Sequence, residues 1–222
     1  MGAPDPAQLL TALTTEHFTL QGARSQTMSE TSARASVYMF SVSSALVALG
    51  FVSQVADGAG TAFNVFALTV LPTIYFLGCA TYVRLVECGA EDLRYGIAIN
   101  RIRGYYKELA GERADLFLLS GHDDAAGVFL NMGLAPDRRS PAFAFSTAVA
   151  VVNGVVGGAV AVLALGAVPG VPLWLAAAVG VIVAAVSIGT WVRHGGRILE
   201  TAAHRVTPRS PTPAPPPAPS PG

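Results

Sequence analysis

Charged side chains are scarce in this sequence, and three long stretches lack them altogether. Only 13% of the 222 residues are Asp, Glu, Lys or Arg, whereas soluble domains carry roughly a quarter. No charge occurs in the 22 residues between Arg34 and Asp57, the 26 between Asp57 and Arg84, or the 53 between Arg139 and Arg193. A bilayer core needs about 20 apolar residues per helix. The first two stretches therefore predict one membrane span each, and the third predicts two.

A turn has to divide the third stretch, and the segment Gly166–Pro172 supplies it. Two prolines and two glycines in seven residues are not accommodated by a continuous helix. Backbone amides find no water in hydrocarbon, so the spans should be helical. We predict an all-α integral membrane protein with four transmembrane helices in two hairpins and with cytoplasmic helical extensions. The alternative, a soluble all-helical protein, would need polar helices to cover the four apolar ones.

These spans divide the chain into five segments. We expect a cytoplasmic N-terminal helix, a first transmembrane hairpin, a cytoplasmic helical loop, a second transmembrane hairpin, and a cytoplasmic Pro-rich disordered tail. Their respective bounds are 1–35, 36–84, 85–140, 141–194 and 195–222. Eight of the 15 prolines follow Arg205, which is typical of a solvated polyproline-II tail. A peptide-docking role for this tail is the alternative.

Basic residues indicate how the protein is oriented. All 14 Lys and Arg residues lie before the first span, between the second and third, or after the fourth. Basic residues at span ends favour the cytoplasmic side of a membrane. We therefore expect a multi-pass protein of the bacterial inner (plasma) membrane with both termini in the cytoplasm. In the second span, Pro72 removes one backbone hydrogen bond and is expected to kink the helix.

Ionisable side chains are missing from the interior of all four predicted spans, and common catalytic motifs are missing from the whole chain. Coupled transporters and proton relays generally need ionisable groups at depth, so this class is disfavoured. The chain has no Walker loop, dinucleotide fingerprint, Gly-x-Ser-x-Gly or zinc-ligand spacing. We therefore predict no cofactor and no catalytic residue. The neutral net charge disfavours a nucleic-acid partner.

Small residues recur at four-residue steps in the third and fourth spans. Such residues let helix backbones approach closely, which drives helix association in lipid. The pattern does not tell whether the partner is a helix of the same chain or of another copy. The predicted helix-packing residues are Ser146, Ala150, Gly154, Gly158, Ala176, Gly180 and Ala184.

A weak metal-site pattern lies between the two hairpins. Glu87 and Glu91 share a helix face, and the run His122-Asp123-Asp124 follows a loop. Carboxylate and imidazole groups suit Mg, Mn or Zn. The ordinary interpretation is that Arg84 and Arg94 pair with the glutamates, and that Asp123 or Asp124 caps the helix that follows.

Three stretches carry a resemblance to a known family: Leu-Gln-Gly-Ala-Arg-Ser-Gln-Thr-Met-Ser-Glu at 20–30, Ile-Asn-Arg-Ile-Arg-Gly-Tyr-Tyr at 99–106, and Phe-Leu-Leu-Ser-Gly-His-Asp-Asp at 117–124. There the chain resembles an uncharacterised family of four-span membrane proteins from high-GC actinobacteria. The resemblance covers about residues 8–195. It implies a bacterial inner-membrane location and implies no activity. The architecture alone is also similar to small membrane effectors of bacterial defence systems.

Together these patterns predict a self-associating plasma-membrane protein that acts as a scaffold, a sensor or a pore-type protein. Its expected partners are membrane lipids, further copies in a homo-oligomer, and a cytoplasmic partner or ligand. One alternative is a membrane enzyme that uses the carboxylates and histidine at the cytoplasmic face. Another is a small uncoupled channel, whose polar path or interhelical hydrogen bonds would come from Asn64, Thr69, Thr73, Asn153 and Ser187.

Overall fold

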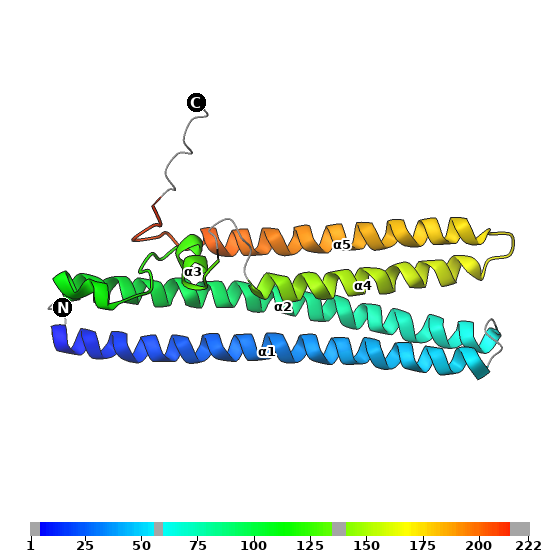
Figure 1. Cartoon of the computed structure of the whole chain (residues 1–222), viewed down its shortest axis with the longest axis horizontal. Coiled ribbons are helices and arrows are strands. Elements are labelled where there is room, and N and C mark those ends of the chain that lie inside the picture. The colour runs from blue at the N-terminus through cyan, green and yellow to red at the C-terminus, as the bar shows by residue number, and fades with distance from the viewer. Residues whose placement is uncertain (1–4, 56–59, 135–140, 214–222) are drawn as a thin grey trace, which may run out of the picture. The chain divides into compact units, whose positions relative to one another are not determined.

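The computed structural model describes residues 5–55, 60–134 and 141–213. The connection at residues 56–59, Arg139 and the tail beyond residue 213 lie outside the described residues. Within them the chain is helical, in the order α1 (Pro6–Val55), α2 (Thr61–Ala110), the 3-10 helix η1 (Gly111–Leu116), α3 (Ala125–Asn131), α4 (Pro141–Gly166) and α5 (Leu173–His204) (Figure 1). Among the described helices, α1, α2, α4 and α5 are long and apolar enough to cross a membrane.

Helix ends follow the local signals of the sequence. Asp5 accepts a hydrogen bond from the N–H of Ala7 at the start of α1, and Asp124 accepts one from Gly127 at the start of α3. Gly111 and Gly133, which follow α2 and α3, have φ angles of 55° and 71°. This left-handed backbone is readily adopted by glycine and ends a helix. Pro72 lies inside α2.

The fourth long helix departs from the sequence prediction. Residues 195–222 are predicted to form a disordered tail, but α5 continues to His204. Two contacts explain the extension. Gly195 leaves room for the side chain of Tyr82, which a methyl group at that position would meet. Farther along, Ala203 packs on the cluster of Leu93, Ile97 and Val128. Buried contacts stabilise a helix more than propensity does.

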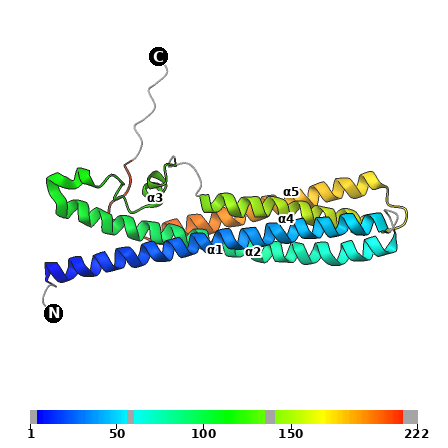
Figure 2. The ribbon, with the colours of Figure 1, turned by 60° about the horizontal axis from the view of Figure 1, so that its bottom comes forward.

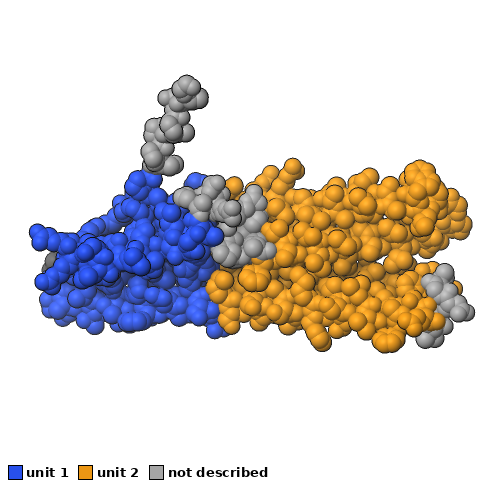
Figure 3. Space-filling view, viewed as in Figure 1, with its two compact units in different colours: residues 1–26, 90–140, 201–222 blue, residues 27–89, 141–200 orange. Residues whose placement is uncertain are grey.

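The chain divides into two compact units (Figure 3). Unit 1 consists of residues 1–26, 90–140 and 201–222, and unit 2 of residues 27–89 and 141–200. In unit 2, α1, α2, α4 and α5 run beside one another (Figures 1 and 2). Tyr38, Tyr82, Leu85 and Val149 are buried in one cluster there. This cluster joins residues of α1, α2 and α4, and side chains of α5 pack against it.

Glycine brings α4 and α5 together in unit 2. A methyl group on Gly158 would lie 2.6 Å from the carbonyl oxygen of Gly180, and one on Gly180 would lie 2.9 Å from that of Gly158. A methyl group on Gly154 would meet Ile188 and, at 3.1 Å, the carbonyl oxygen of Ala184. The small-residue face of α4 thus packs on α5 of the same chain.

The remaining predicted packing residues are also enclosed in unit 2. Ser146 and Ala150 are each 1% exposed, and Ala176 is fully buried. Ala150 belongs to the cluster around Tyr38 and Tyr82. The stripe is therefore divided between contacts with α5 and contacts with α1 and α2.

Polar groups inside unit 2 bond to each other between helices. The hydroxyl of Tyr38 donates to Asn153 Oδ1 at 3.0 Å, and the hydroxyls of Tyr75 and Ser187 lie 3.3 Å apart. A methyl group on Gly78 would collide with Asn153, so glycine makes room for that bond. The hydroxyls of Thr69 and Thr73 instead donate to carbonyls of their own helix, to Val65 and Thr69.

Replacing two helix glycines by alanine should shift stability in opposite directions. Gly158→Ala puts its methyl group against the backbone of α5, and we expect it to lower the free energy of unfolding by about 1–3 kcal/mol. Gly189→Ala meets nothing within 4 Å and should raise it by about 0.5–1 kcal/mol, the helix propensity gained. Unfolding in mild detergent, followed by circular dichroism, measures both. Equal effects of the two variants would contradict the close packing of α4 on α5.

Candidate functional site

The candidate site lies in unit 1, where the chain returns along α2 after η1. Gly104 on α2 and Gly121 in the returning loop bring two backbones into contact. A methyl group on Gly121 would lie 2.8 Å from the Cα atom of Gly104, and one on Gly104 would lie 3.1 Å from the carbonyl oxygen of Gly121. This close approach sets the three residues that follow, 122–124, directly against α2.

Two asparagines hold the loop in register. Asn100 donates to the carbonyl of His122 at 2.9 Å and accepts from Asn131 on α3 at 2.9 Å. Asn131 also accepts from the N–H of Ser120 at 2.7 Å, while Arg103 donates to Asn100 at 2.7 Å. Amides that satisfy one another in this way favour a single arrangement.

An apolar contact fastens α3 to α2. Val128 is 1% exposed and packs against Leu93 and Ile97, with Phe129 at the edge of the cluster. A methyl group on Gly96 would lie 2.8 Å from Val128, so this part of α2 is also in close contact. The cap residue of α3, Asp124, is thereby positioned on the surface of unit 1.

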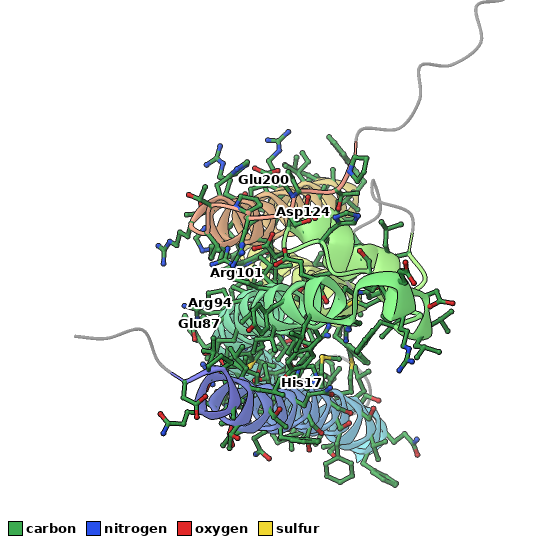
Figure 4. The ribbon with its side chains drawn as sticks, turned by 90° about the vertical axis from the view of Figure 1, so that its left-hand side faces the viewer. His17, Glu87, Arg94, Arg101, Asp124 and Glu200 are labelled. Carbon is green, nitrogen blue, oxygen red and sulfur yellow. The ribbon has the colours of Figure 1, made fainter. Side chains whose placement is uncertain are left out.

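Asp123 and Asp124, together with Arg101 of α2, hold the C-terminal segment of the chain. We call these three residues the clasp and residues 207–212 the held segment. Arg101 and Asp124 are labelled in Figure 4. Arg101 donates to Asp123 Oδ2 at 2.6 Å and to the carbonyl oxygen of Thr207 at 2.7 Å.

Asp123 bonds the middle of the held segment through both side chain and backbone. Its carboxylate accepts the N–H of Arg209 at 3.0 Å and that of Ser210 at 2.7 Å. Its own N–H donates to the carbonyl of Ser210 at 3.2 Å. The residue is only 1% exposed, so these donors replace the water that a carboxylate needs.

Asp124 bonds the end of the held segment. Its carboxylate accepts the N–H of Thr212 at 2.6 Å and the Thr212 hydroxyl at 2.6 Å, in addition to capping α3. The other positions of 208–213 are prolines, which have no N–H. Every backbone N–H from 208 to 213 is therefore accepted by one of two carboxylates.

The charges of the clasp follow from these bonds. Burial raises the pKa of Asp123, but hydrogen bonds from Arg209, Ser210 and Arg101 outweigh it and lower that pKa below its ordinary value. Burial likewise raises the pKa of Asp124, but hydrogen bonds from Thr212 and Gly127 outweigh it and lower that pKa below its ordinary value. Both carboxylates are thus ionised at neutral pH, as acceptors of N–H groups should be.

Salt bridges elsewhere in the two units connect α1 to α2. In unit 1, Arg24 donates to both oxygens of Asp92, at 2.8 and 3.2 Å, and Asp92 is 2% exposed. In unit 2, Arg84 donates to both oxygens of Glu30, at 2.9 and 3.1 Å. Hydrogen bonds from Arg84 and Arg34 lower the pKa of Glu30, which precedes the first uncharged stretch, to about 2.

The structure does not gather the five residues of the predicted metal site. Among the described residues, no three His, Cys, Asp or Glu side chains form a group that could hold a metal. Glu87 lies in unit 2 and pairs with Arg84 at 3.3 Å. Glu91, His122, Asp123 and Asp124 lie in unit 1, and the oxygens of both aspartates accept the donors described above. Asp124 is the helix cap that the sequence offered as the ordinary interpretation.

Several residues of the candidate site escaped the sequence analysis. Arg101 was given no role of its own, and Arg209, Ser210 and Thr212 lay in a segment predicted to be disordered. One signal pointed to them, namely that prolines at 208, 211 and 213 leave few N–H groups to satisfy.

No protein-family model, curated protein sequence or solved structure matches the chain.

Acid should release the held segment from the clasp. The aspartate pKa values are lower when the segment is held than the ordinary value of about 3.9. The stabilisation from these carboxylates is therefore complete above about pH 4, and it is lost as pH falls through the lowered pKa values. Hydrogen-exchange protection of the Arg209, Ser210 and Thr212 amides, corrected for intrinsic rates, should fall below pH 4. The amides of Leu175 and Ala176, which donate to the carbonyl of Pro172, are the internal control. Unchanged protection of the segment at pH 2.5 would contradict the assignment.

Proposed function

We propose that this chain is a multi-pass integral membrane protein, and that it acts as a membrane-anchored scaffold or sensor through unit 1. The observation that supports membrane insertion is the distribution of polarity in unit 2. Its polar side chains bond to one another inside, as Tyr38 does to Asn153. Large apolar side chains of the same helices are exposed, among them Phe40 at 74%, Phe76 at 71% and Val181 at 69%.

This surface suits hydrocarbon better than water. Monomeric soluble proteins rarely expose large contiguous apolar patches, and unit 2 exposes apolar side chains on each of its four helices. Representative residues are Phe40, Leu46, Val47 and Phe51 on α1, Val65 and Phe76 on α2, Val151 and Val155 on α4, and Trp174, Val181, Ile182 and Val186 on α5. Lipid chains would cover them, while the helices satisfy their own backbone groups.

Charge supports an orientation with unit 1 in the cytoplasm. The segments of unit 1 carry Arg24, Arg101 and Arg103, whereas the connection Ala167–Pro172 between α4 and α5 carries no charge. By the positive-inside bias, both termini lie in the cytoplasm of a bacterial plasma membrane. The resemblance to four-span actinobacterial membrane proteins agrees with this location.

The clasp supports a binding role for unit 1. It holds a segment of chain through hydrogen bonds to backbone and hydroxyl groups. A scaffold or sensor needs a surface that holds a segment reversibly, and polar contacts at the surface of a module are suited to that. The carboxylates of the clasp act as acceptors and leave no open pair for acid–base work.

The other predicted functions receive less support. The small-residue face proposed for self-association packs within the chain, at Gly158 and Gly180, so the homo-oligomer stays a prediction. A polar path along α2 would need free hydroxyls, but those of Thr69 and Thr73 donate to their own helix. The enzyme alternative would need the carboxylates that the clasp employs.

Cysteine labelling in intact cells tests the membrane topology. We expect Gly22→Cys, in unit 1, to react with an impermeant maleimide only after the cells are opened. Val168→Cys, 49% exposed between α4 and α5, should react in intact cells. The parent chain sets the background, because Cys79 is half-buried and Cys88 buried. A chain that is recovered in the soluble fraction, or Gly22→Cys that reacts in intact cells, would overturn the proposed topology.

A further inference from the structure

The clasp recognises the held segment mainly through its backbone. The carbonyl of Thr207 accepts from Arg101, the N–H groups of Arg209 and Ser210 donate to Asp123, and the carbonyl of Ser210 accepts from Asp123. Thr212 completes the row at Asp124. None of these bonds depends on the segment being part of the same chain.

Three side chains of the held segment are also in contact with the rest of unit 1. The Thr212 hydroxyl donates to Asp124 at 2.6 Å, and the guanidinium of Arg209 lies 3.6 Å from Glu108. The Ser210 hydroxyl lies 3.4 Å from His122 Nδ1. The groups that these side chains meet are the acceptors Glu108, His122 and Asp124. They favour a peptide with a basic residue, then serine, and then, two positions after the serine, threonine or another residue with a hydroxyl group.

Proline at fixed positions completes the match. Pro208, Pro211 and Pro213 bring no N–H to the clasp, so two carboxylates suffice for the whole segment. Another residue at position 211 would add a donor for which the clasp shows no acceptor. Proline also reduces the freedom that a free peptide loses on binding, as in other proline-rich ligands.

The contact is polar and shallow. A small hollow next to the segment is lined by Arg101, Tyr105, Glu108 and Asp123, together with Arg209 and Ser210 themselves. No large apolar side chain of the segment is inserted into it. Charge-assisted hydrogen bonds therefore dominate, and salt should weaken binding.

From this arrangement we infer that the clasp is a binding site for an extended, proline-spaced peptide of the type Thr-Pro-Arg-Ser-Pro-Thr on another protein. The chain's own residues 207–212 occupy the site until such a peptide displaces them. The inference rests on the proposed function insofar as unit 1 must face the compartment that holds the partner. A tethered segment competes at an effective concentration in the millimolar range, so the intact chain is self-blocked.

Removing the held segment should open the site. The probe is the synthetic peptide Thr-Pro-Arg-Ser-Pro-Thr-Pro with a fluorescent label, and its anisotropy is measured with purified protein in detergent. A chain that ends at Val206 should bind the peptide at least about tenfold more tightly than the full chain, because the tethered competitor is gone. Full-length Ser210→Pro, which removes one donated N–H, should also bind more tightly than the parent.

Matched variants show whether the peptide uses the clasp. In the shortened chain, Asp124→Asn should weaken binding by about tenfold or more, because charged acceptors form the stronger hydrogen bonds. Asp115→Asn, at an exposed position of η1 in the same unit, should leave affinity unchanged. A peptide with valine at the position of Thr212 should bind less tightly than the original, and one with alanine at the position of Pro211 should do so as well.

The outcomes separate this inference from the proposed function. If the shortened chain and Ser210→Pro both keep the helix content of the parent and neither binds the peptide at millimolar concentration, the inference is wrong and the topology is untouched. Equal loss of binding in Asp124→Asn and Asp115→Asn also overturns it. Conversely, Gly22→Cys labelled from outside intact cells removes the proposed function, whatever the peptide does.

Discussion

Contact between backbones at glycine is the constraint on which both units depend. In unit 2, Gly158 and Gly180 let α4 and α5 touch, and Gly78 leaves room for Asn153 beside Tyr38. In unit 1, Gly104 and Gly121 set the loop against α2, so that Asp123 and Asp124 face the held segment. A side chain at any of these positions would meet atoms of the neighbouring element at 3.1 Å or less, so that the contact would have to shift.

The two units resolve the same problem of buried polar groups in different ways. Unit 2 pairs buried polar side chains such as Tyr38 and Asn153 between helices and exposes apolar ones, an arrangement that suits lipid as the surroundings. Unit 1 uses charge: Asp92 is bonded by Arg24, and Asp123 by Arg101 and two backbone N–H groups. Buried carboxylates are retained because each is supplied with donors. The aspartates of the clasp differ from Asp92 in that they also accept N–H groups of the held segment.

Residues 20–30, 99–106 and 117–124 contain many of the side chains that join one element to another. Residues 20–30 include Arg24 and Glu30, which pair α1 with α2, in unit 1 and unit 2 respectively. Residues 99–106 and 117–124 include Asn100, Arg101 and the two aspartates of the clasp. These are charged and amide side chains whose partners lie far away in the sequence. Arg101 is 22 residues from Asp123, Glu30 is 54 residues from Arg84, and Arg24 is 68 residues from Asp92. Their roles are therefore set by pairing and not by local structure.

The sequence by itself determined the four long apolar helices, the turn at 166–172, the glycine ends of α2 and α3, and a helix cap at Asp123 or Asp124. These features depend on composition and on neighbours within a few residues, where local rules are strong. Only the tertiary structure decided that the small-residue face of α4 packs on α5 of the same chain, that α5 continues to His204, and that residues 207–212 are held by the clasp. Each of these rests on contacts between distant segments, such as Thr212 with Asp124, 88 residues apart. Periodicity in the sequence carries no information about such pairs, because it records which face of a helix is apolar and not what will cover it.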